Sequence, residues 1–442
     1  MKTATSLACS TCGFSSPKWF GRCPDCGDWN TATGVGSNGS APLAIIALNA
    51  AGSSAPTRSA CGIADVDRVL GGGLVPGEVV LLAGEPGIGK STLVLQILAG
   101  LRAGGHGALL ATGEETLRQV GERARRLFGD DHNLEATDCA DVELLAKLVA
   151  DGTHDVVAID SIQTLVDSSV QQGSGSVTQV RESVLRLAAA ARRSGTAIVL
   201  TGHVTKDGSV AGPKILEHVV DAVVSLEGER GGPLRLLCAL KNRYGSCDET
   251  GIFQMSGSGL LSVDDPSRMM LSDRRSQAIG SVVFPGMTGT RPVLVEVQAL
   301  VVESDLPQPR RVAIGFDPRR LTLALAVLNQ RLRLPPSKRD VFVAVAGGIL
   351  VREPAIDLAL TLAILSAVTE TPLGDDVVAF GEIGLAGEVR RVPAAERRLS
   401  EASRLGFRRA LVPPACDTQS FDHALSVRDV EAALRFFVPD KA

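Results

Sequence analysis

Short apolar segments alternate with longer helical segments through the middle of the chain. Apolar runs bounded by turn residues occupy 78–83, 108–112, 156–160 and 197–201. Segments typical of helices lie between them, at 91–98, 115–128 and 177–194. This order of strand and helix predicts a parallel sheet with helices on both faces, an α/β fold.

A second series of strands and helices follows a hairpin predicted over residues 252–263. A polar joint at 264–276 separates the two series. The pattern predicts helices at 317–332, 354–369 and 393–405, and strands at 281–284, 292–302, 341–345, 377–380 and 409–412. We therefore expect a second folded domain of the α+β class.

Residues 32–59 differ from the rest in composition. They are rich in Gly, Ser, Ala, Asn and Pro and almost free of charge, which is typical of a flexible linker. We therefore expect four parts: a small N-terminal domain over 1–31, the linker, an α/β domain over 60–265 and the α+β domain over 277–442.

The overall composition is that of a soluble globular protein with two or three domains, at 442 residues with 45% hydrophobic and 21% charged side chains. The formal net charge of −4 argues against a basic coat over the whole surface, although local basic patches remain possible. No apolar leader follows Met1, and the longest apolar run, 359–368, is too short to span a bilayer. We expect a cytoplasmic protein that makes no membrane contact.

The strongest motif lies between the first predicted strand and the first predicted helix. Residues 84–92 match the nucleoside-triphosphate loop G-x-x-x-x-G-K-[ST] at every fixed position. They are Gly84, Glu85, Pro86, Gly87, Ile88, Gly89, Lys90, Ser91 and Thr92. Backbone N–H groups and the helix N-terminus would hold the phosphates, Lys90 would reach the β- and γ-phosphates, and Ser91 would ligate Mg²⁺. The alternative, a glycine-rich turn with a chance lysine, leaves the flanking strand and helix unexplained, so we predict binding of ATP and Mg²⁺.

Two acidic residues follow predicted strands of the same sheet. Asp160 ends the strand at 156–160, where a carboxylate that supports the Mg²⁺ ion is expected beside the phosphate loop. Glu114 follows the strand at 108–112 and is our candidate for the base that orients the attacking water. The alternative for Glu114 is that it caps the next helix, and for Asp160 that it is an ordinary strand end.

Two C-x-x-C pairs lie near the start of the chain, separated by ten residues and each followed by glycine. Four thiolates at this spacing predict a tetrahedral structural zinc site whose metal supplies the folding energy of a very short segment. The proposed ligands are Cys9, Cys12, Cys23 and Cys26. A redox C-x-x-C would need a thioredoxin-like βαβ setting, which is missing. The nine cysteines do not form a secreted disulfide framework.

Both tryptophans of the chain, Trp19 and Trp29, fall in or beside this cysteine segment. They would stack on bases or on a partner protein, or else pack around the zinc site. The sequence leaves both interpretations open.

The segments 202–208, 211–221 and 240–245 resemble the bacterial RadA (Sms) recombination proteins, relatives of RecA. The RadA signature, usually Lys-Asn-Arg-Phe-Gly, here consists of Lys241, Asn242, Arg243, Tyr244 and Gly245. Tyr244 keeps the aromatic ring and adds a hydroxyl. The cysteine pairs, phosphate loop, signature and C-terminal part all occur in the family order, so the resemblance covers nearly the whole chain and implies a RecA-like domain.

The resemblance implies roles for several residues. Lys241 and Arg243 would reach the ATP of a neighbouring subunit, or else lie on a solvated edge that touches DNA phosphate or nothing. Lys206 and Lys214 lie in the segment that resembles the loop facing single-stranded DNA. His203, at the end of a strand, would be the sensor that couples the γ-phosphate to that loop, or a satisfied structural histidine.

The C-terminal part resembles the proteolytic domain of Lon. Aligning 352–357 and 381–389 with the Lon motifs puts Ala355 in the place of the nucleophilic serine and Glu396 in the place of the lysine. Neither side chain can do that chemistry, so we expect a retained fold without protease activity. Lon domains form hexameric rings, which suggests a ring scaffold. Its basic residues would line a DNA path or form a solvated helix face; they include Arg310, Arg311, Arg319, Arg320, Arg331, Arg333, Lys338 and Arg339.

The sequence thus predicts a DNA-dependent ATPase of recombination, DNA repair and the response to DNA damage. By family resemblance it would act as a hexameric, helicase-like ring on single-stranded and branched DNA, drive branch migration, and work with a RecA-type recombinase. One alternative is an ATP switch that scaffolds partner proteins without movement. Another, an ATP-dependent protease of the Lon type, is opposed by Ala355 and Glu396.

Overall fold

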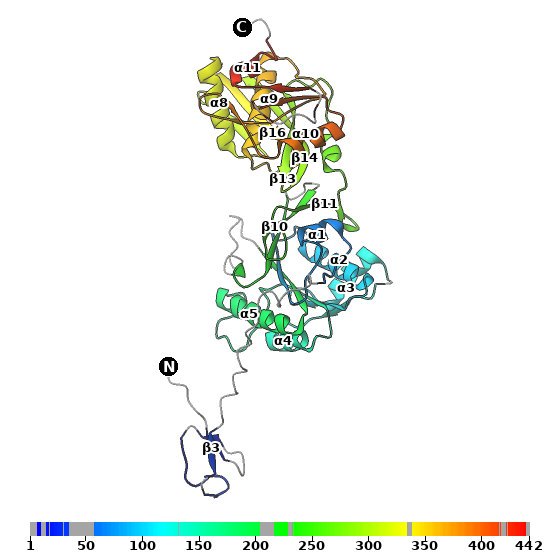
Figure 1. The fold of residues 1–442 in the computed structure, drawn as a ribbon, viewed down its shortest axis with the longest axis vertical. Helices are drawn as coiled ribbons and strands as arrows, with labels where there is room; N and C mark the ends of the chain where they lie inside the picture. The colour runs from blue at the N-terminus through cyan, green and yellow to red at the C-terminus, as the bar shows by residue number, and fades with distance from the viewer. Residues whose placement is uncertain are drawn as a thin grey trace, which may run out of the picture. The chain divides into compact units, whose positions relative to one another are not determined.

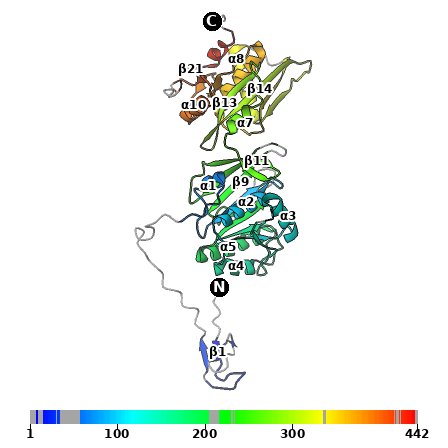
Figure 2. The same ribbon diagram turned by 90° about the vertical axis from the view of Figure 1, so that its right-hand side faces the viewer.

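The structure is a computed structural model. In it the chain forms two compact units, residues 1–56 and 57–442. Figure 1 and Figure 2 show the fold in two views at right angles. The described residues are 7–9, 15–16, 18–29, 31–34, 57–130, 132–203, 216–228, 232, 234–333, 338–414, 416, 421 and 423–438. Among them, no helix combines the length and the apolar character needed to cross a membrane.

The N-terminal unit contains a small antiparallel sheet of three strands in the order β2-β1-β3. The strands are β1 (Leu7–Cys9), β2 (Ser15–Ser16) and β3 (Ala32–Gly34). β3 pairs with β1, so the first residues of the expected linker belong to this sheet. At the other end of the expected linker, Ser59 forms a bridge with Leu74 of the second unit. The structure therefore shortens the linker at both ends, and residues 35–56 lie outside the described part.

The predicted α/β domain is built on a nine-stranded sheet in the order β12-β11-β10-β9-β4-β8-β7-β5-β6. The strands from β9 to β6 along this order are parallel. They are β4 (Val79–Gly84), β5 (Ala108–Thr112), β6 (Glu135–Thr137), β7 (Val156–Asp160), β8 (Ala197–His203) and β9 (Ala222–Glu227). Three antiparallel strands extend the sheet: β10 (Leu234–Asn242), β11 (Thr250–Ser256) and β12 (Gly259–Ser262). The hairpin expected at 252–263 is the pair β11–β12.

Helices cover both faces of this sheet, as the sequence predicts (Figure 2). Alternate residues of β4 pack into different cores: Val80 and Leu82 with α1, α2 and α3, and Val79 and Leu81 with α4 and α5. The helices are α1 (Ala64–Val69), α2 (Lys90–Ala103), α3 (Leu117–Phe128), α4 (Val142–Asp151) and α5 (Val177–Ser194). β6 and α4 were not predicted. β6 has only three residues, none of them buried, so it gives no apolar run in the sequence.

The C-terminal domain has a mixed seven-stranded sheet in the order β15-β16-β14-β13-β17-β20-β21. Its strands are β13 (Ser281–Thr288), β14 (Arg291–Glu303), β15 (Arg311–Ile314), β16 (Arg339–Val345), β17 (Val377–Ala379), β20 (Arg409–Val412) and β21 (His423–Ser426), with a small hairpin β18 (Glu382–Ile383) and β19 (Val389–Arg390). Its helices are α8 (Pro318–Leu332), the 3₁₀ turn η2 (Pro354–Ile356), α9 (Asp357–Thr369), α10 (Ala395–Arg404) and α11 (Val430–Leu434). The eight elements predicted here are present, and β15, β18, β19, β21 and α11 are additional. α9 is buried over its first ten residues and forms the centre of the core.

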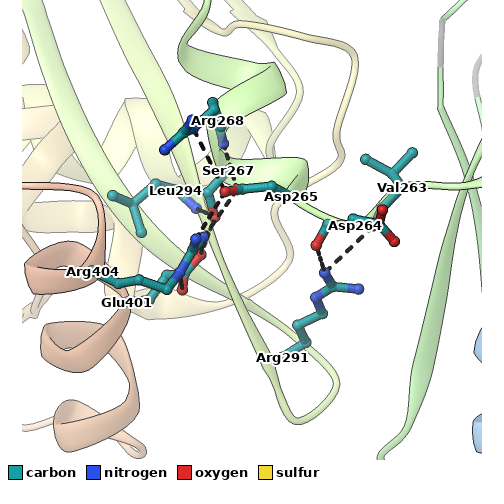
Figure 3. A network of polar contacts seen from close by, with 9 residues as sticks. All are labelled: Val263, Asp264, Asp265, Ser267, Arg268, Arg291, Leu294, Glu401 and Arg404. Carbon is teal, nitrogen blue, oxygen red and sulfur yellow. Dashed lines mark hydrogen bonds and ion pairs between the residues drawn. The ribbon is translucent and has the colours of Figure 1, made fainter.

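The segment expected as a polar joint contains a helix, α7 (Pro266–Leu271), that is bound to the C-terminal domain (Figure 3). Arg404 of α10 donates two hydrogen bonds to Asp265, at 2.8 and 2.9 Å. The Ser267 hydroxyl donates to Glu401 at 2.5 Å and accepts from the backbone N–H of Leu294 at 3.1 Å. The bonds from Arg404 lower the pKa of Asp265 to about 2, so this carboxylate stays charged over the physiological range.

The two domains of the second unit also share a core and polar contacts. Leu234 and Ile252 of the nine-stranded sheet belong to the hydrophobic cluster of the C-terminal domain. At the tip between β13 and β14, the N–H of Thr290 donates to the carbonyl of Asp248 at 2.7 Å. Arg291 donates to the carbonyl of Asp264 at 2.5 Å. The C-terminal domain is therefore attached to the α/β domain through packed side chains as well as through the chain.

A fully buried arginine organises one end of the C-terminal core. The Arg398 side chain has no exposed area and forms a two-point ion pair with Glu353, at 3.0 and 2.5 Å. It also donates to the carbonyls of Pro285 and Pro393, and lies near the rings of Phe284 and Phe380.

We predict that Arg398→Ala lowers the free energy of unfolding of this domain by about 3–5 kcal/mol, because it removes a fully buried side chain and leaves the partly buried Glu353 carboxylate without its partner. Denaturant unfolding followed by circular dichroism measures this. The neighbouring Arg397 is exposed and serves as the control, with Arg397→Ala expected to stay within about 0.5 kcal/mol of the parent. Equal losses of unfolding free energy in both variants would contradict the stabilising role of the buried Arg398–Glu353 pair.

Candidate functional site

The phosphate loop connects β4 to α2, and α2 begins at Lys90. Gly89 caps this helix with φ 119°, a conformation that L side chains rarely adopt. A Cβ atom at this position would also lie 2.6 Å from the Cε atom of Met255 in β11. The loop therefore depends on glycine here, and the antiparallel part of the sheet supports it from outside.

Lys90 lies at the floor of this loop and is 5% exposed. Its Nζ atom donates to the carbonyls of Gly84 and Glu85, at 2.9 and 3.0 Å. Burial lowers the pKa of Lys90, against the opposing effect of the nearby carboxylates of Asp160 and Glu114. The ammonium group thus lies where the loop would place the phosphates.

A line of polar contacts runs from Lys90 to the candidate base. The Nζ atom of Lys90 lies 3.2 Å from Nδ1 of His203, and Nε2 of His203 lies 3.3 Å from Oε1 of Glu114. Because an ammonium group can only donate, Nδ1 of His203 accepts the bond from Lys90. Nε2 then carries the hydrogen atom and donates a hydrogen bond to Glu114. The hydroxyl of Ser161 donates a second hydrogen bond to the same carboxylate oxygen. His203 therefore connects the phosphate loop to Glu114.

The register of the parallel sheet explains why these residues meet. His203 in β8 is paired with Gly84 in β4, and Asp160 in β7 is paired with Thr112 in β5. All of them are at the carboxyl ends of parallel strands, which meet at one edge of the sheet. Asp160 accepts a 2.5 Å hydrogen bond from the Thr201 hydroxyl, which orients its carboxylate. Asp160 and Ser91 remain the predicted side chains for Mg²⁺.

Glu114 does not cap the following helix. α3 begins at Leu117, two residues later than expected, and Thr116 and Gln119 form a capping box at its start. The next residue, Glu115, forms an ion pair with Arg123 at 2.6 Å. The capping alternative for Glu114 is therefore wrong, and its carboxylate is directed to His203 and Ser161.

Lys241 and Arg243 lie at the opposite edge of the sheet from the phosphate loop. Arg243 follows β10, and its N–H pairs with the carbonyl of Asp221, whose own N–H pairs with Val79 at the start of β4. The phosphate loop begins five residues further along β4, about 16 Å away at ~3.3 Å per residue. Lys241 is paired with Val223, which is level with Leu81 in the middle of β4, so it lies nearer to the loop than Arg243 does. Among the described residues, the hydrogen bonds of both side chains go to residues 217–221 and not to the phosphate loop.

Both cations make contacts within their own subunit. Lys241 donates to the carbonyls of Glu217 and Val220, and burial lowers its pKa. Arg243 donates to Asp221 at 2.9 Å, and half of its side chain is exposed. The rest of the signature is structural here: the Asn242 side chain accepts from the N–H of Tyr244, and a Cβ on Gly245 would lie 3.2 Å from Gly71.

The predicted zinc ligands that the structure describes lie together. The Sγ atoms of Cys9, Cys23 and Cys26 are all within 4.8 Å of one another, and those of Cys9 and Cys26 are 3.6 Å apart. Sulfur atoms on a tetrahedral zinc ion with ~2.3 Å bonds would be about 3.8 Å apart, so the arrangement fits this metal. Cys12, the fourth predicted ligand, lies outside the described residues. So do Lys206 and Lys214, whose proposed DNA contacts remain predictions.

The positions aligned with the Lon catalytic pair hold no nucleophile. Ala355 is buried in η2 and Glu396 is exposed in α10. Two of the basic residues considered for a DNA path form ion pairs within the domain: Arg310 with Asp340 at 3.2 Å and Arg320 with Asp357 at 3.0 Å. Arg319, Arg331 and Arg333 are exposed.

Comparison with known families matches three parts of the chain. The model of the rubredoxin metal binding domain matches residues 8–32, the model of an AAA domain matches 53–209, and the model of subunit ChlI of Mg-chelatase matches 316–416. These matches agree with the predicted zinc-binding, ATPase and C-terminal domains.

Three relatives match nearly the whole length of the chain. The chain is 46% identical to the DNA repair protein RadA of Pseudomonas aeruginosa, with 93% of each chain covered. It is 44% identical to the Escherichia coli protein of that name, over 93% of this chain and 92% of the relative. It is 41% identical to that of Bacillus subtilis, over 94% of this chain and 93% of the relative. The chain therefore belongs to the RadA family of DNA repair proteins and carries an ATP-hydrolysing AAA domain.

Proposed function

We propose that this protein is a DNA-dependent motor that loads on single-stranded DNA and drives branch migration of recombination intermediates as a hexameric ring. The observation that carries the proposal is the division of functional groups between two edges of one sheet. The phosphate loop and Glu114 lie at one edge, whereas Lys241 and Arg243 lie at the other. In this proposal a single chain does not complete its own ATP site, and the two cations act on the site of an adjacent subunit.

Within one subunit, Lys90 and the loop N–H groups would bind the phosphates of ATP. Ser91 and Asp160 would hold Mg²⁺, which when bound neutralises charge on the β- and γ-phosphates. Glu114, fixed by Ser161 and His203, would orient the attacking water and accept its proton. The charge that develops on the γ-phosphate would be stabilised by Lys241 and Arg243 of the adjacent subunit.

His203 would report the state of the nucleotide to DNA. It contacts both Lys90 and Glu114, and it is the last residue of β8. The next residues in sequence lead to Lys206 and Lys214, the candidate DNA contacts. A change in the His203 contacts on ATP binding would therefore act directly on the start of that segment.

A non-motor ATP switch that recruits recombination proteins is the second candidate. The observation that favours it is the exposure of Trp19 and Trp29, at 69% and 70%, on the zinc-binding unit. Exposed aromatic side chains of this kind are suited to docking on a partner such as a RecA-type recombinase, or to stacking on bases. The protease alternative has no support, because Ala355 cannot attack a carbonyl.

The motor proposal predicts ATP-driven unwinding of a forked, partly single-stranded DNA by the intact protein. Lys90→Ala should abolish unwinding together with ATP binding. Glu114→Gln should keep ATP binding and lose hydrolysis on the order of 10²–10⁴-fold, because the base is gone. Strand separation followed by fluorescence measures this. DNA binding and ATP hydrolysis without strand movement would favour the switch.

The cations at the opposite edge should act on turnover and not on binding. We predict that Lys241→Ala and Arg243→Ala each lower ATP turnover in the assembled protein by up to about 10³-fold, while the dissociation constant for ATP stays within about threefold of the parent. Lys147→Ala, which removes an exposed lysine that pairs with Glu143, is the control and should have no effect on either quantity. Loss of ATP binding would instead place Lys241 in its own subunit's site.

A further inference from the structure

A buried arginine of the antiparallel part of the sheet contacts the phosphate loop. Arg235 lies at the start of β10, two strands from β4, and is 7% exposed. Its Nε atom donates to the carbonyl of Ile88, inside the phosphate loop, at 3.3 Å. It is on the same face of β10 as Leu237 and Ala239, which pack into the core beneath α2.

The contact fixes the orientation of one peptide group of the loop. The bond between Ile88 and Gly89 is trans, so its C=O and N–H groups point in opposite directions. Because Arg235 draws the Ile88 carbonyl outward, the N–H of Gly89 is turned to the other side of the loop. Gly89 precedes Lys90, and the N–H groups at this point of such loops are those that hold phosphate oxygens.

The charge of Arg235 has no carboxylate partner in the described part of the chain. Its Nη1 atom donates to the carbonyls of Gly232 and Leu234, at 2.8 and 2.7 Å, so all of its contacts there are with backbone oxygens. A buried cation is unfavourable unless an anion compensates it. The nucleotide that the loop binds carries several negative charges and would supply this compensation.

We propose that Arg235 is a positioning residue for the phosphate loop. It holds the Ile88–Gly89 peptide in the orientation that binds phosphate, and its own charge is compensated by the bound triphosphate. This inference rests on the proposed function only in that residues 84–92 bind ATP, and it does not depend on DNA movement.

Equilibrium binding of a non-hydrolysable ATP analogue to the full chain, without DNA, tests the role. Arg235→Ala should raise the dissociation constant about tenfold or more, and Arg235→Lys, which keeps both the charge and a donor, should restore it to within about threefold. Arg102→Ala is the matched control. Arg102 is a partly buried arginine at the far end of α2 that pairs with Glu135, and its removal should leave ATP affinity unchanged.

The dissociation constant is calculated from the concentration of folded protein. A variant that is only less stable therefore keeps the parent value. If Arg235→Ala does not fold, Arg235→Gln, which keeps a donor but not the charge, replaces it with the same expected loss. Wild-type affinity in the Ala or Gln variant would overturn the role of Arg235. Lys90→Ala, measured in parallel, distinguishes failure of the Arg235 proposal from failure of the proposed function. If Lys90→Ala also binds the analogue normally, residues 84–92 are not the ATP-binding loop.

Discussion

The structure depends on one constraint: parallel strands bring their carboxyl ends to a single edge of a sheet. Four parallel strands are neighbours in the order β4, β8, β7 and β5. The residues at their carboxyl ends therefore lie close together. Lys90, His203 and Glu114 are joined by two contacts across 113 and 89 residues of sequence. The antiparallel strand β10 runs back toward the opposite edge, with Lys241 near its end and Arg243 directly after it. This reversal of direction places the phosphate loop and the two signature cations at different edges, which is why we propose that a neighbouring subunit completes the site.

The antiparallel extension of the sheet also stabilises the loop at the catalytic edge. Arg235 of β10 holds the carbonyl of Ile88, and Met255 of β11 lies against Gly89. Gln96 of α2 makes two hydrogen bonds with the backbone of Leu260 in β12, both at 2.9 Å. These strands lie between the phosphate loop and the C-terminal domain, whose core includes Leu234 and Ile252. The C-terminal domain is therefore connected through packed strands to the phosphate loop, although its positions aligned with the Lon catalytic pair hold alanine and glutamate.

Local patterns predicted the elements well and predicted contacts poorly. The phosphate loop, the strands around it, and the positions of Glu114 and Asp160 at strand ends follow from spacing and from the order of strand and helix. The bonds from Ser161 and His203 to Glu114, and from Arg235 to Ile88, join residues far apart in sequence, and no local signal marks them. Arg398 was missed for a related reason: a charged residue in a polar helix is expected at the surface, and only its pairing with Glu353 allows burial. The boundary errors at residues 32–34 and at the start of α3 arose where short strands and caps decide the ends of elements.

The central claim is that the cations of one subunit complete the ATP site of the next, and mixing two inactive variants tests it most directly. Lys90→Ala destroys the phosphate loop but keeps Arg243, and Arg243→Ala keeps the phosphate loop but lacks the cation. Each variant alone should hydrolyse ATP poorly, and mixed assemblies should recover turnover, with a maximum at intermediate ratios. If Arg243 served its own subunit, no site in the mixture would hold both groups. A mixture that stays as inactive as its components would therefore contradict the account.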